Sequence, residues 1–325
     1  MKCIQVKEPG GPEKMSLVDV KTPEPGPGQA LVRIVASGVN FLDVYLRMGA
    51  YYKVEMPLTL GNEAAGTVEA VGRDVTEVAV GDRVAYAMVR GSYAEYAVVP
   101  AGQLVKIPDG VGFVAAAATM LQGMTAHYLT HSTYKWTSDD TCLVHAAAGG
   151  AGGLLVQVAK MRGARVLGTV STEEKARVAR ECGADETILY TKEPFDEAVK
   201  RITGGRGVDV VYDSVGQDTF EGSLNSLRTR GMLVVFGQSS GPVPPVDTGT
   251  LNRKGSLFLT RTGLSHHLLT REELLWRAGD VLDWVATGKI TPRIGATYPL
   301  SEAATAHRDL ESRRTVGKLI LTVDV

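Results

Sequence analysis

A glycine-rich turn between an apolar strand and an apolar helix constrains this chain more than any other feature. Residues 141–153 read Thr-Cys-Leu-Val-His-Ala-Ala-Ala-Gly-Gly-Ala-Gly-Gly, and an apolar run resumes directly after them. The first backbone amides of a helix have no intrahelical partners and lie at the positive end of its dipole, so they can bind a diphosphate. The segment therefore predicts a strand–turn–helix unit with an anion site at the start of the helix.

The turn departs at one position from the dinucleotide-binding fingerprint G-x-G-x-x-G. Aligned on the later glycines, the chain reads Ala147-Ala148-Gly149-Gly150-Ala151-Gly152, with alanine where the first glycine is expected. The fingerprint also requires a preceding strand, a following helix and a surrounding βαβ unit, and the sequence pattern contains all three. Glycines at such a turn can also serve only to let the helix pack closely against the strand. The features of the rest of the chain are therefore needed to choose between an anion site and close packing.

Two patterns of predicted secondary structure divide the chain. Up to about residue 122, short alternating or β-branched runs separated by Pro/Gly turns predict a β-rich domain. From residue 141, apolar strands alternate with helices, which predicts a doubly wound parallel sheet. Strands are expected at 141–147, 165–170, 208–212, 232–236 and 255–260, and helices at 153–161, 173–181, 194–202 and 219–227. We expect left-handed helix caps at Gly163, Gly183 and Gly231.

Composition disfavours several classes of function. A formal net charge of -1 offers no general attraction for nucleic acid or anionic membranes. The three cysteines are widely spaced, which indicates neither a disulfide framework nor a thiolate zinc knuckle. No apolar run approaches the ~20 residues that span a bilayer, and the amino terminus lacks a signal-peptide pattern. We therefore expect a cytoplasmic protein.

The end of the second strand indicates which dinucleotide is bound. NAD-selective proteins place an acidic side chain about 20 residues after the glycine turn, where it bonds the ribose 2′-OH. This chain has hydroxyl side chains there, Ser171 among them, and Lys175 follows in the first turn of the next helix. Hydroxyls and a cation suit the 2′-phosphate of NADPH. The alternative is that Lys175 is a solvated surface charge.

Several motifs in the same order resemble one protein family along nearly the whole chain. They include residues 37–45, Ser-Gly-Val-Asn-Phe-Leu-Asp-Val-Tyr, residues 61–66, Gly-Asn-Glu-Ala-Ala-Gly, and residues 236–241, Phe-Gly-Gln-Ser-Ser-Gly. The chain resembles the zinc-free NADPH:quinone oxidoreductases, the zeta-crystallin-like branch of the medium-chain dehydrogenase/reductase superfamily. The resemblance implies an α/β fold with a GroES-like catalytic domain, residues 1–124 and 262–325, and a Rossmann NADPH-binding domain, residues 125–261. It also implies a homodimer paired through the last strand of the cofactor sheet.

Zinc alcohol dehydrogenases of the same superfamily have a cysteine where this chain has Asn40 and a histidine where it has Asn62. Two amides without thiolate or imidazole do not form a usual zinc site, so we expect no metal. His127 and His131 share a helix face by their spacing but lack the glutamate of H-E-x-x-H, which favours ordinary helix histidines.

The resemblance implies specific site residues. It places Asn40 and Tyr45 by the nicotinamide and the substrate opening, and Tyr51 where related reductases use an active-site tyrosine. It assigns the remaining cofactor contacts to Tyr128, Gly149, Gly150, Ala151, Gly152, Ser171, Lys175, Tyr190, Ser214, Phe236, Gly237, Gln238, Ser239 and Arg313. A turn-forming amide is the alternative for Asn40, and packed aromatic rings are the alternative for Tyr45, Tyr128 and Phe236.

The leading functional hypothesis is metal-free hydride transfer from NADPH to a quinone or another conjugated carbonyl. An enoyl-thioester reductase is the first alternative, and Tyr51 is the residue that supports it. The second alternative is a non-enzymatic NADPH-binding protein, crystallin-like or RNA-binding, although the charge balance does not favour RNA.

Overall fold

The computed structural model describes residues 1–49, 51, 54–137 and 139–323, which form two compact units. Met1–Met124 and Leu268–Val325 make up the first unit, and Thr125–His267 the second. Each unit has its own hydrophobic core.

The second unit contains a six-stranded sheet in which every neighbouring pair is parallel. Its strand order is β11-β10-β9-β12-β13-β14. The strands are β9 (Thr141–Val144), β10 (Arg165–Val170), β11 (Glu186–Leu189), β12 (Val208–Asp213), β13 (Leu227–Val235) and β14 (Phe258–Arg261). Their almost wholly apolar, buried sequences are typical of a parallel sheet that is covered on both faces.

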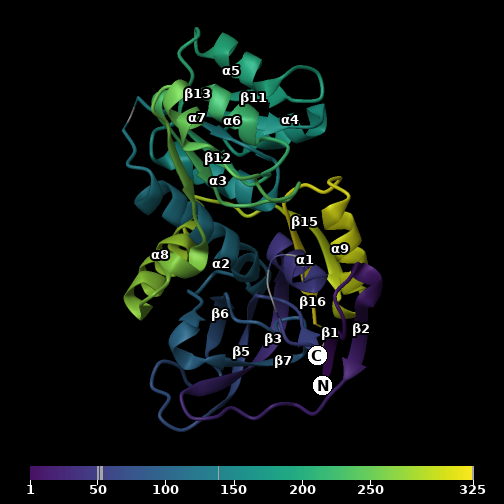
Figure 1. The fold of residues 1–325 in the computed structure, drawn as a ribbon. Helices are drawn as coiled ribbons and strands as arrows, with labels where there is room; N and C mark the ends of the chain where they lie inside the picture. The colour runs from purple at the N-terminus through teal and green to yellow at the C-terminus, as the bar shows by residue number, and fades with distance from the viewer. Residues whose placement is uncertain (50, 52–53, 138, 324–325) are drawn as a thin grey trace. The chain divides into compact units, whose positions relative to one another are not determined.

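Five helices connect these strands (Figure 1). They are α3 (Gly150–Met161), α4 (Glu173–Glu181), α5 (Phe195–Ile202), α6 (Phe220–Ser226) and α7 (Thr248–Arg253). The chain moves outward from β9 through β10 to β11 and then in the opposite direction from β12 to β14. Because such crossovers are right-handed, the two series of helices cover opposite faces. The order reverses between β9 and β12, which is where doubly wound sheets bind ligands at their carboxyl edge.

The structure confirms the predicted doubly wound sheet. The strand expected at 165–170 and the helix expected at 173–181 have the predicted bounds. Gly163 and Gly183 have the left-handed conformation, with φ of 84° and 106°. The cap expected at Gly231 is wrong: this residue lies inside β13, and the positive φ of 59° belongs to Arg230, within a register shift between β12 and β13. Strand β11 was not predicted, because its sequence Glu-Thr-Ile-Leu is too short and mixed to stand out.

The first unit is β-rich. A seven-stranded sheet has the order β15-β16-β3-β5-β6-β8, with β7 paired to β3, and β2-β1-β4 form a three-stranded sheet. Their bounds are β1 (Lys2–Val6), β2 (Met15–Asp19), β3 (Gln29–Val39), β4 (Leu58–Thr59), β5 (Glu63–Val71), β6 (Arg83–Ala87), β7 (Tyr96–Pro100), β8 (Val105–Lys106), β15 (Ile294–Pro299) and β16 (Lys318–Thr322). Strand β3 is long enough to pair with β16, β5 and β7, so it holds segments from both ends of the chain together.

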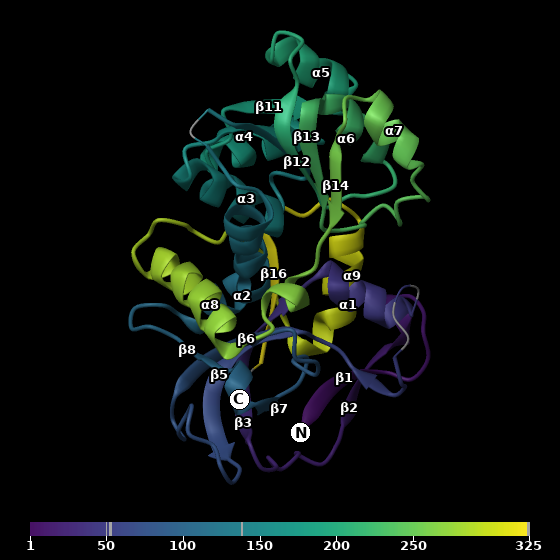
Figure 2. The ribbon, with the colours of Figure 1, turned by 60° about the vertical axis from the view of Figure 1, so that its left-hand side comes forward.

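The longer helices of this unit are α1 (Phe41–Met48), α8 (Arg271–Ala286) and α9 (Ala303–Glu311), and α2 (Phe113–Tyr128) runs from the first unit into the second. Helix α8 packs along β8 (Figure 2). The shorter helical turns of this unit are Pro12–Lys14, Ala101–Gln103 and Leu300–Glu302, and those of the second unit are Leu129–Thr133 and Leu264–His267. Within the described part of the chain, no helix combines the length and apolar character needed to cross a membrane.

Candidate active site

The glycine turn of the second unit forms an open cradle at the start of α3. Gly149 is the N-cap residue, and having no side chain it cannot cap the first amides of the helix. A Cβ at Gly152 would overlap the carbonyl oxygen of Ala146, so the turn closes this tightly only with glycine there. The amides of Gly150, Ala151 and Gly152 belong to the first turn of α3, and the first amides of a helix are the groups that bind a diphosphate.

The predicted 2′-phosphate residues come together beside this cradle. Strands β10 and β11 pair with Val170 opposite Leu189, so Ser171 and Tyr190 follow directly at adjacent strand ends. The hydroxyl of Thr191 donates to the carbonyl of Ser171 at 3.0 Å and links the two ends. Thr172 caps α4 by accepting a hydrogen bond from the backbone N–H of Lys175 at 3.2 Å. Partial burial lowers the pKa of the Lys175 ammonium, and an approaching phosphate would restore favourable surroundings for its charge.

The ends of β12 and β13 bring a second group of predicted residues together. Ser214 follows β12, and residues 236–239 follow β13. The backbone N–H of Phe236 donates to the carbonyl of Asp213 at 2.8 Å, and that of Ser239 to the carbonyl of Ser214 at 3.2 Å. A Cβ at Gly237 would overlap the Ser214 carbonyl. The Phe-Gly-Gln-Ser segment therefore lies against Ser214 at the carboxyl edge of the sheet.

Tyr128 reaches the same edge from α2. Its hydroxyl is 3.0 Å from Oγ1 of Thr262, which directly follows β14, and its ring stacks on His267 at 4.2 Å between centroids. Only 1% of Tyr128 is exposed, so its ring is part of the packed interior as well as lying near the end of β14. His145, which the sequence did not favour as an acid or base, is buried between the hydroxyls of Thr169 and Ser223, at 2.9 and 3.0 Å.

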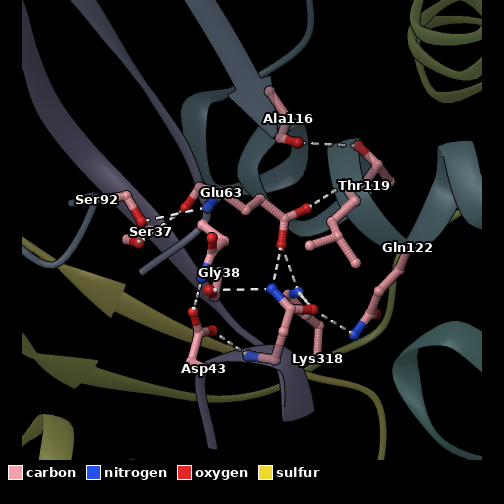
Figure 3. Close-up of polar contacts among 12 residues, drawn as sticks. Ser37, Gly38, Asp43, Glu63, Ser92, Ala116, Thr119, Gln122 and Lys318 are labelled. Carbon is pink, nitrogen blue, oxygen red and sulfur yellow. Dashed lines mark hydrogen bonds and ion pairs between the residues drawn. The ribbon is translucent and has the colours of Figure 1, made fainter. Parts of the chain in front are cut away.

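In the first unit, Asn40 is buried in a polar network that includes Glu63 and Lys318, and these two partners are labelled in Figure 3. Its Oδ1 accepts from Nζ of Lys318 at 2.7 Å and from Nε2 of Gln122 at 3.2 Å. Its Nδ2 donates to Oε2 of Glu63 at 2.9 Å and to the carbonyl of Gly38 at 3.3 Å. An amide has two acceptor and two donor positions, so the side chain of Asn40 is fully used by its neighbours.

Lys318 and Glu63 form a buried ion pair inside this network. Their Nζ and Oε2 atoms lie 2.6 Å apart, with exposed side-chain fractions of 1% and 0%. The other carboxylate oxygen of Glu63 accepts the backbone N–H of Leu121, in α2, at 2.5 Å. A side chain at Gly38 would overlap the Glu63 carboxylate, so this glycine leaves room for the pair. The ion pair thus joins β5, β16, α1 and α2.

Asp43, in α1, is a buried carboxylate that only accepts hydrogen bonds. Its donors are the backbone N–H of Asn40 at 2.9 Å, Nδ2 of Asn62 at 2.7 Å and the hydroxyl of Tyr93 at 3.2 Å. Burial raises its pKa to about 6, against the opposing effect of these hydrogen bonds. The carboxylate therefore remains ionised at neutral pH at a cost in stability.

A chain of donors leads to Asp43 from the surface of the unit. Arg47 contacts Glu311 at 2.7 Å and donates to Nδ1 of His307 at 2.9 Å. Because arginine only donates, the remaining ring proton of neutral His307 lies on Nε2, 3.1 Å from the hydroxyl of Tyr93. Burial and the Arg47 charge lower the pKa of His307 to about 3, so the ring is neutral. Every bond in the chain is thus oriented toward Asp43.

The site does not fit zinc. Where zinc-dependent members have a thiolate and an imidazole, this chain has the amides of Asn40 and Asn62, and the ammonium of Lys318 bonds directly to Asn40. The Lys318 ammonium occupies Oδ1 of Asn40, and amides are in any case poor ligands for zinc. Among the described residues, no group of three or more His, Cys, Asp or Glu side chains is arranged to hold a metal ion. His127 and His131 stack on each other at 4.2 Å.

The predicted tyrosines pair with one another, Tyr45 from within α1 and Tyr51 from the segment that follows it. Their rings are in T-shaped contact at 5.3 Å between centroids, and the ring of Tyr45 is tilted on Phe41 at 6.2 Å. Tyr51 is 39% exposed, so it presents aromatic surface to a ligand. Arg313 is exposed and follows α9 with a φ of 59°, apart from the Asn40 network.

Sequence reasoning missed Glu63, Asp43, Gln122 and Lys318, which hold Asn40 in place. The signal was present for two of them. Lys318 begins the apolar strand Lys-Leu-Ile-Leu-Thr, and Glu63 begins a strand whose next residues are Ala-Ala-Gly. A charged residue in a buried apolar strand requires a partner, so an acid and a base of this kind are candidates for one another.

Family models match both parts of the chain. The alcohol dehydrogenase GroES-like domain matches residues 26–109, and the zinc-binding dehydrogenase domain matches residues 182–321. The chain is 46% identical to the quinone oxidoreductase of Pseudomonas aeruginosa, over 98% of this chain and 99% of that protein. It is 44% identical to the 2-haloacrylate reductase of a Burkholderia species, over 97% of each.

Solved structures agree with these relatives. The quinone oxidoreductase of Escherichia coli, solved in complex with NADPH, superposes with a TM-score of 0.97 at 42% identity, covering 99% of this chain and 100% of that one. The predicted GroES-like and Rossmann parts are thereby confirmed. The chain belongs to the quinone oxidoreductase branch of the medium-chain dehydrogenase/reductase superfamily.

Proposed function

We propose that this protein is an NADPH-dependent reductase that transfers hydride to a quinone or another conjugated carbonyl without a metal. The observation that carries the proposal is the arrangement at the carboxyl edge of the six-stranded sheet. There the uncapped start of α3 and the Ser171, Lys175 and Tyr190 cluster lie at neighbouring strand ends. The first suits a diphosphate and the second a 2′-phosphate.

The cofactor residues are proposed as follows. The amides of Gly149, Gly150, Ala151 and Gly152 bind the diphosphate, while Ser171, Lys175 and Tyr190 bind the 2′-phosphate. Ser214, Phe236, Gly237, Gln238 and Ser239 contact the cofactor farther along the same edge, together with Tyr128. The related E. coli enzyme was solved with NADPH, which supports this choice of cofactor. Arg313 is retained as a proposed contact on the resemblance alone.

When bound, NADPH supplies a hydride from its nicotinamide ring. A quinone gains two electrons with that hydride, and one proton from water completes the hydroquinone. The chain's own part is to hold the reactants within ~3–3.5 Å of one another and to exclude water. We assign Tyr45 and Tyr51 to the acceptor, because an edge-to-face aromatic pair offers a surface on which a flat conjugated ring packs.

Asn40 is proposed to support the nicotinamide region from within the network. Its side chain is committed to Lys318, Glu63, Gln122 and Gly38, so it shapes this region rather than exchanging protons. Lys318, whose charge is paired with Glu63, keeps Oδ1 of Asn40 directed toward its ammonium and so fixes the orientation of this amide.

An acceptor screen tests the proposal. Oxidation of NADPH, followed at 340 nm, is measured with 1,4-benzoquinone, 9,10-phenanthrenequinone, 2-chloroacrylate and crotonyl thioester, each repeated with NADH. We expect fast turnover of a quinone with NADPH and weak turnover with NADH. Turnover of the thioester alone would instead assign the enoyl reductase, with Tyr51 as its acid. NADPH binding without turnover of any acceptor would assign a non-enzymatic role.

We propose that the protein is a homodimer paired through β14. This strand ends the six-stranded sheet, and its Phe258 is 57% exposed. An apolar edge strand is a template for a second strand, and a two-fold axis would extend the sheet continuously. A cytoplasmic location is proposed because the three cysteines form no disulfide in the described part of the chain, which suits a reducing compartment. Sedimentation and cell fractionation test these two points.

A further inference from the structure

The polar network around Asn40 ends at an unsatisfied atom. Among the described residues, Oε1 of Gln122 has no hydrogen-bond partner, although the atom is buried. Its Nε2, in contrast, donates to Oδ1 of Asn40 at 3.2 Å (Figure 3). Buried acceptors are nearly always paired, so such an atom requires an explanation.

The orientation of the Gln122 amide follows from the charges behind it. The ammonium of Lys318 can only donate, so Oδ1 of Asn40 must face it. The carboxylate of Glu63 accepts the Nδ2 group of the same amide, which fixes that end as well. With Oδ1 of Asn40 directed at Gln122, the nitrogen of Gln122 must face Asn40, which leaves the oxygen of Gln122 as the unpaired atom. The ion pair thereby determines that the free position is an acceptor.

We infer that Oε1 of Gln122 is a ligand-binding atom that accepts a hydrogen bond from an N–H or O–H donor of the bound reactants. A quinone carries only acceptors and cannot supply this bond. The nicotinamide carboxamide carries an N–H donor, and the hydroquinone product carries an O–H donor. The unpaired acceptor is unfavourable in the ligand-free protein, so a ligand that supplies a donor recovers that free energy on binding. The inference rests on the proposed function.

The test removes the bond from each side in turn. Gln122→Met keeps the length and helix preference of the side chain without its amide. Gln122→Asn keeps the amide but shortens the side chain by one methylene. This variant replaces Gln122→Met in the test if the methionine variant does not fold. Gln103→Met, on the exposed surface of the same unit, is the matched control. Circular dichroism establishes that each variant is folded.

Two ligand pairs distinguish the sources of the donor, and binding is measured by calorimetry. NADP+ is compared with its 3-acetylpyridine analogue, whose acetyl group has no N–H. Hydroquinone is compared with 1,4-dimethoxybenzene on the NADP+-loaded protein. We expect the wild type and Gln103→Met to bind the donor-bearing ligand more tightly in one of the two pairs. Both Gln122 variants should lose about two- to tenfold of that preference, as for one neutral hydrogen bond.

The pair in which the preference falls identifies the donor. Preferences equal to those of the wild type in both pairs, with NADP+ still bound, would overturn the inference and leave the proposed function standing. Failure of the wild type to bind NADP+ would overturn both.

Discussion

The ion pair between Lys318 and Glu63 gives the sharpest prediction. Lys318→Met leaves the fully buried Glu63 carboxylate without its cation, although Asn40 and the Leu121 amide still donate to it. Removing one partner of a buried pair costs about 3–5 kcal/mol, because the remaining charge is uncompensated. In a domain of 150–250 residues this lowers Tm by roughly 6–20 °C. Differential scanning calorimetry measures the change.

Two further variants establish that charge is the cause. Lys14→Met breaks a lysine–glutamate contact of 2.5 Å in the same unit, but with partners 40% and 66% exposed, so we expect Tm close to the wild-type value. Adding Glu63→Gln to Lys318→Met removes the stranded charge and should restore at least half of the lost Tm. A drop for Lys318→Met no larger than that for Lys14→Met would refute the reasoning.

Three other perturbations follow from the structure. Lys175→Ala should weaken NADPH binding by roughly ten- to hundredfold and leave NADH unchanged, since a charged hydrogen bond contributes about 1.5–3 kcal/mol; equal losses in titrations of both cofactors would contradict this. Because burial raises the folded pKa of Asp43 above its unfolded value, its stabilising contribution is present at low pH and is lost as pH rises through about 6. Between pH 5 and 7 the unfolding free energy should fall by about 1 kcal/mol from this group, and Asp43→Asn should abolish that part of the slope in urea titrations. Phe258→Asp should convert the proposed dimer to a monomer in sedimentation, and an unchanged mass would exclude β14 as the interface.

The strongest patterns in the sequence predicted the fold of the second unit well. Apolar strands such as β10 and an N-cap at Thr172 are local signals, and local signals determine where a strand or helix begins. The failures were non-local. Gly231 is the residue type that usually ends a helix, but it lies in β13, which pairs with β12. The positive φ is found at Arg230 instead. Strand β11 has its parallel partner, β10, on the far side of a helix in the chain.

The residues of the candidate site show the same difference between local and non-local signals. That the residues proposed to bind the cofactor lie at neighbouring strand ends of the second unit could be predicted, because the ends of parallel strands meet at one edge wherever their sequences lie. The Asn40 network was not, because Lys318 lies 278 positions from Asn40 and 255 from Glu63. The motif around Asn40 indicated only that the chain lacks the thiolate that binds zinc in related enzymes. Only the three-dimensional arrangement showed that the ammonium group of Lys318 bonds to Asn40.

Metal-free turnover tests the central claim most directly. The protein is treated with dipicolinate and EDTA, its zinc content is measured by plasma emission, and quinone-dependent oxidation of NADPH is followed at 340 nm before and after zinc is added back. We predict full activity in protein that contains less than stoichiometric zinc, and no increase in activity when zinc is added. The reason is that Lys318 and the amides of Asn40 and Asn62 leave no ligand set for the metal. Activity that disappears with the metal and returns with added zinc would contradict the account.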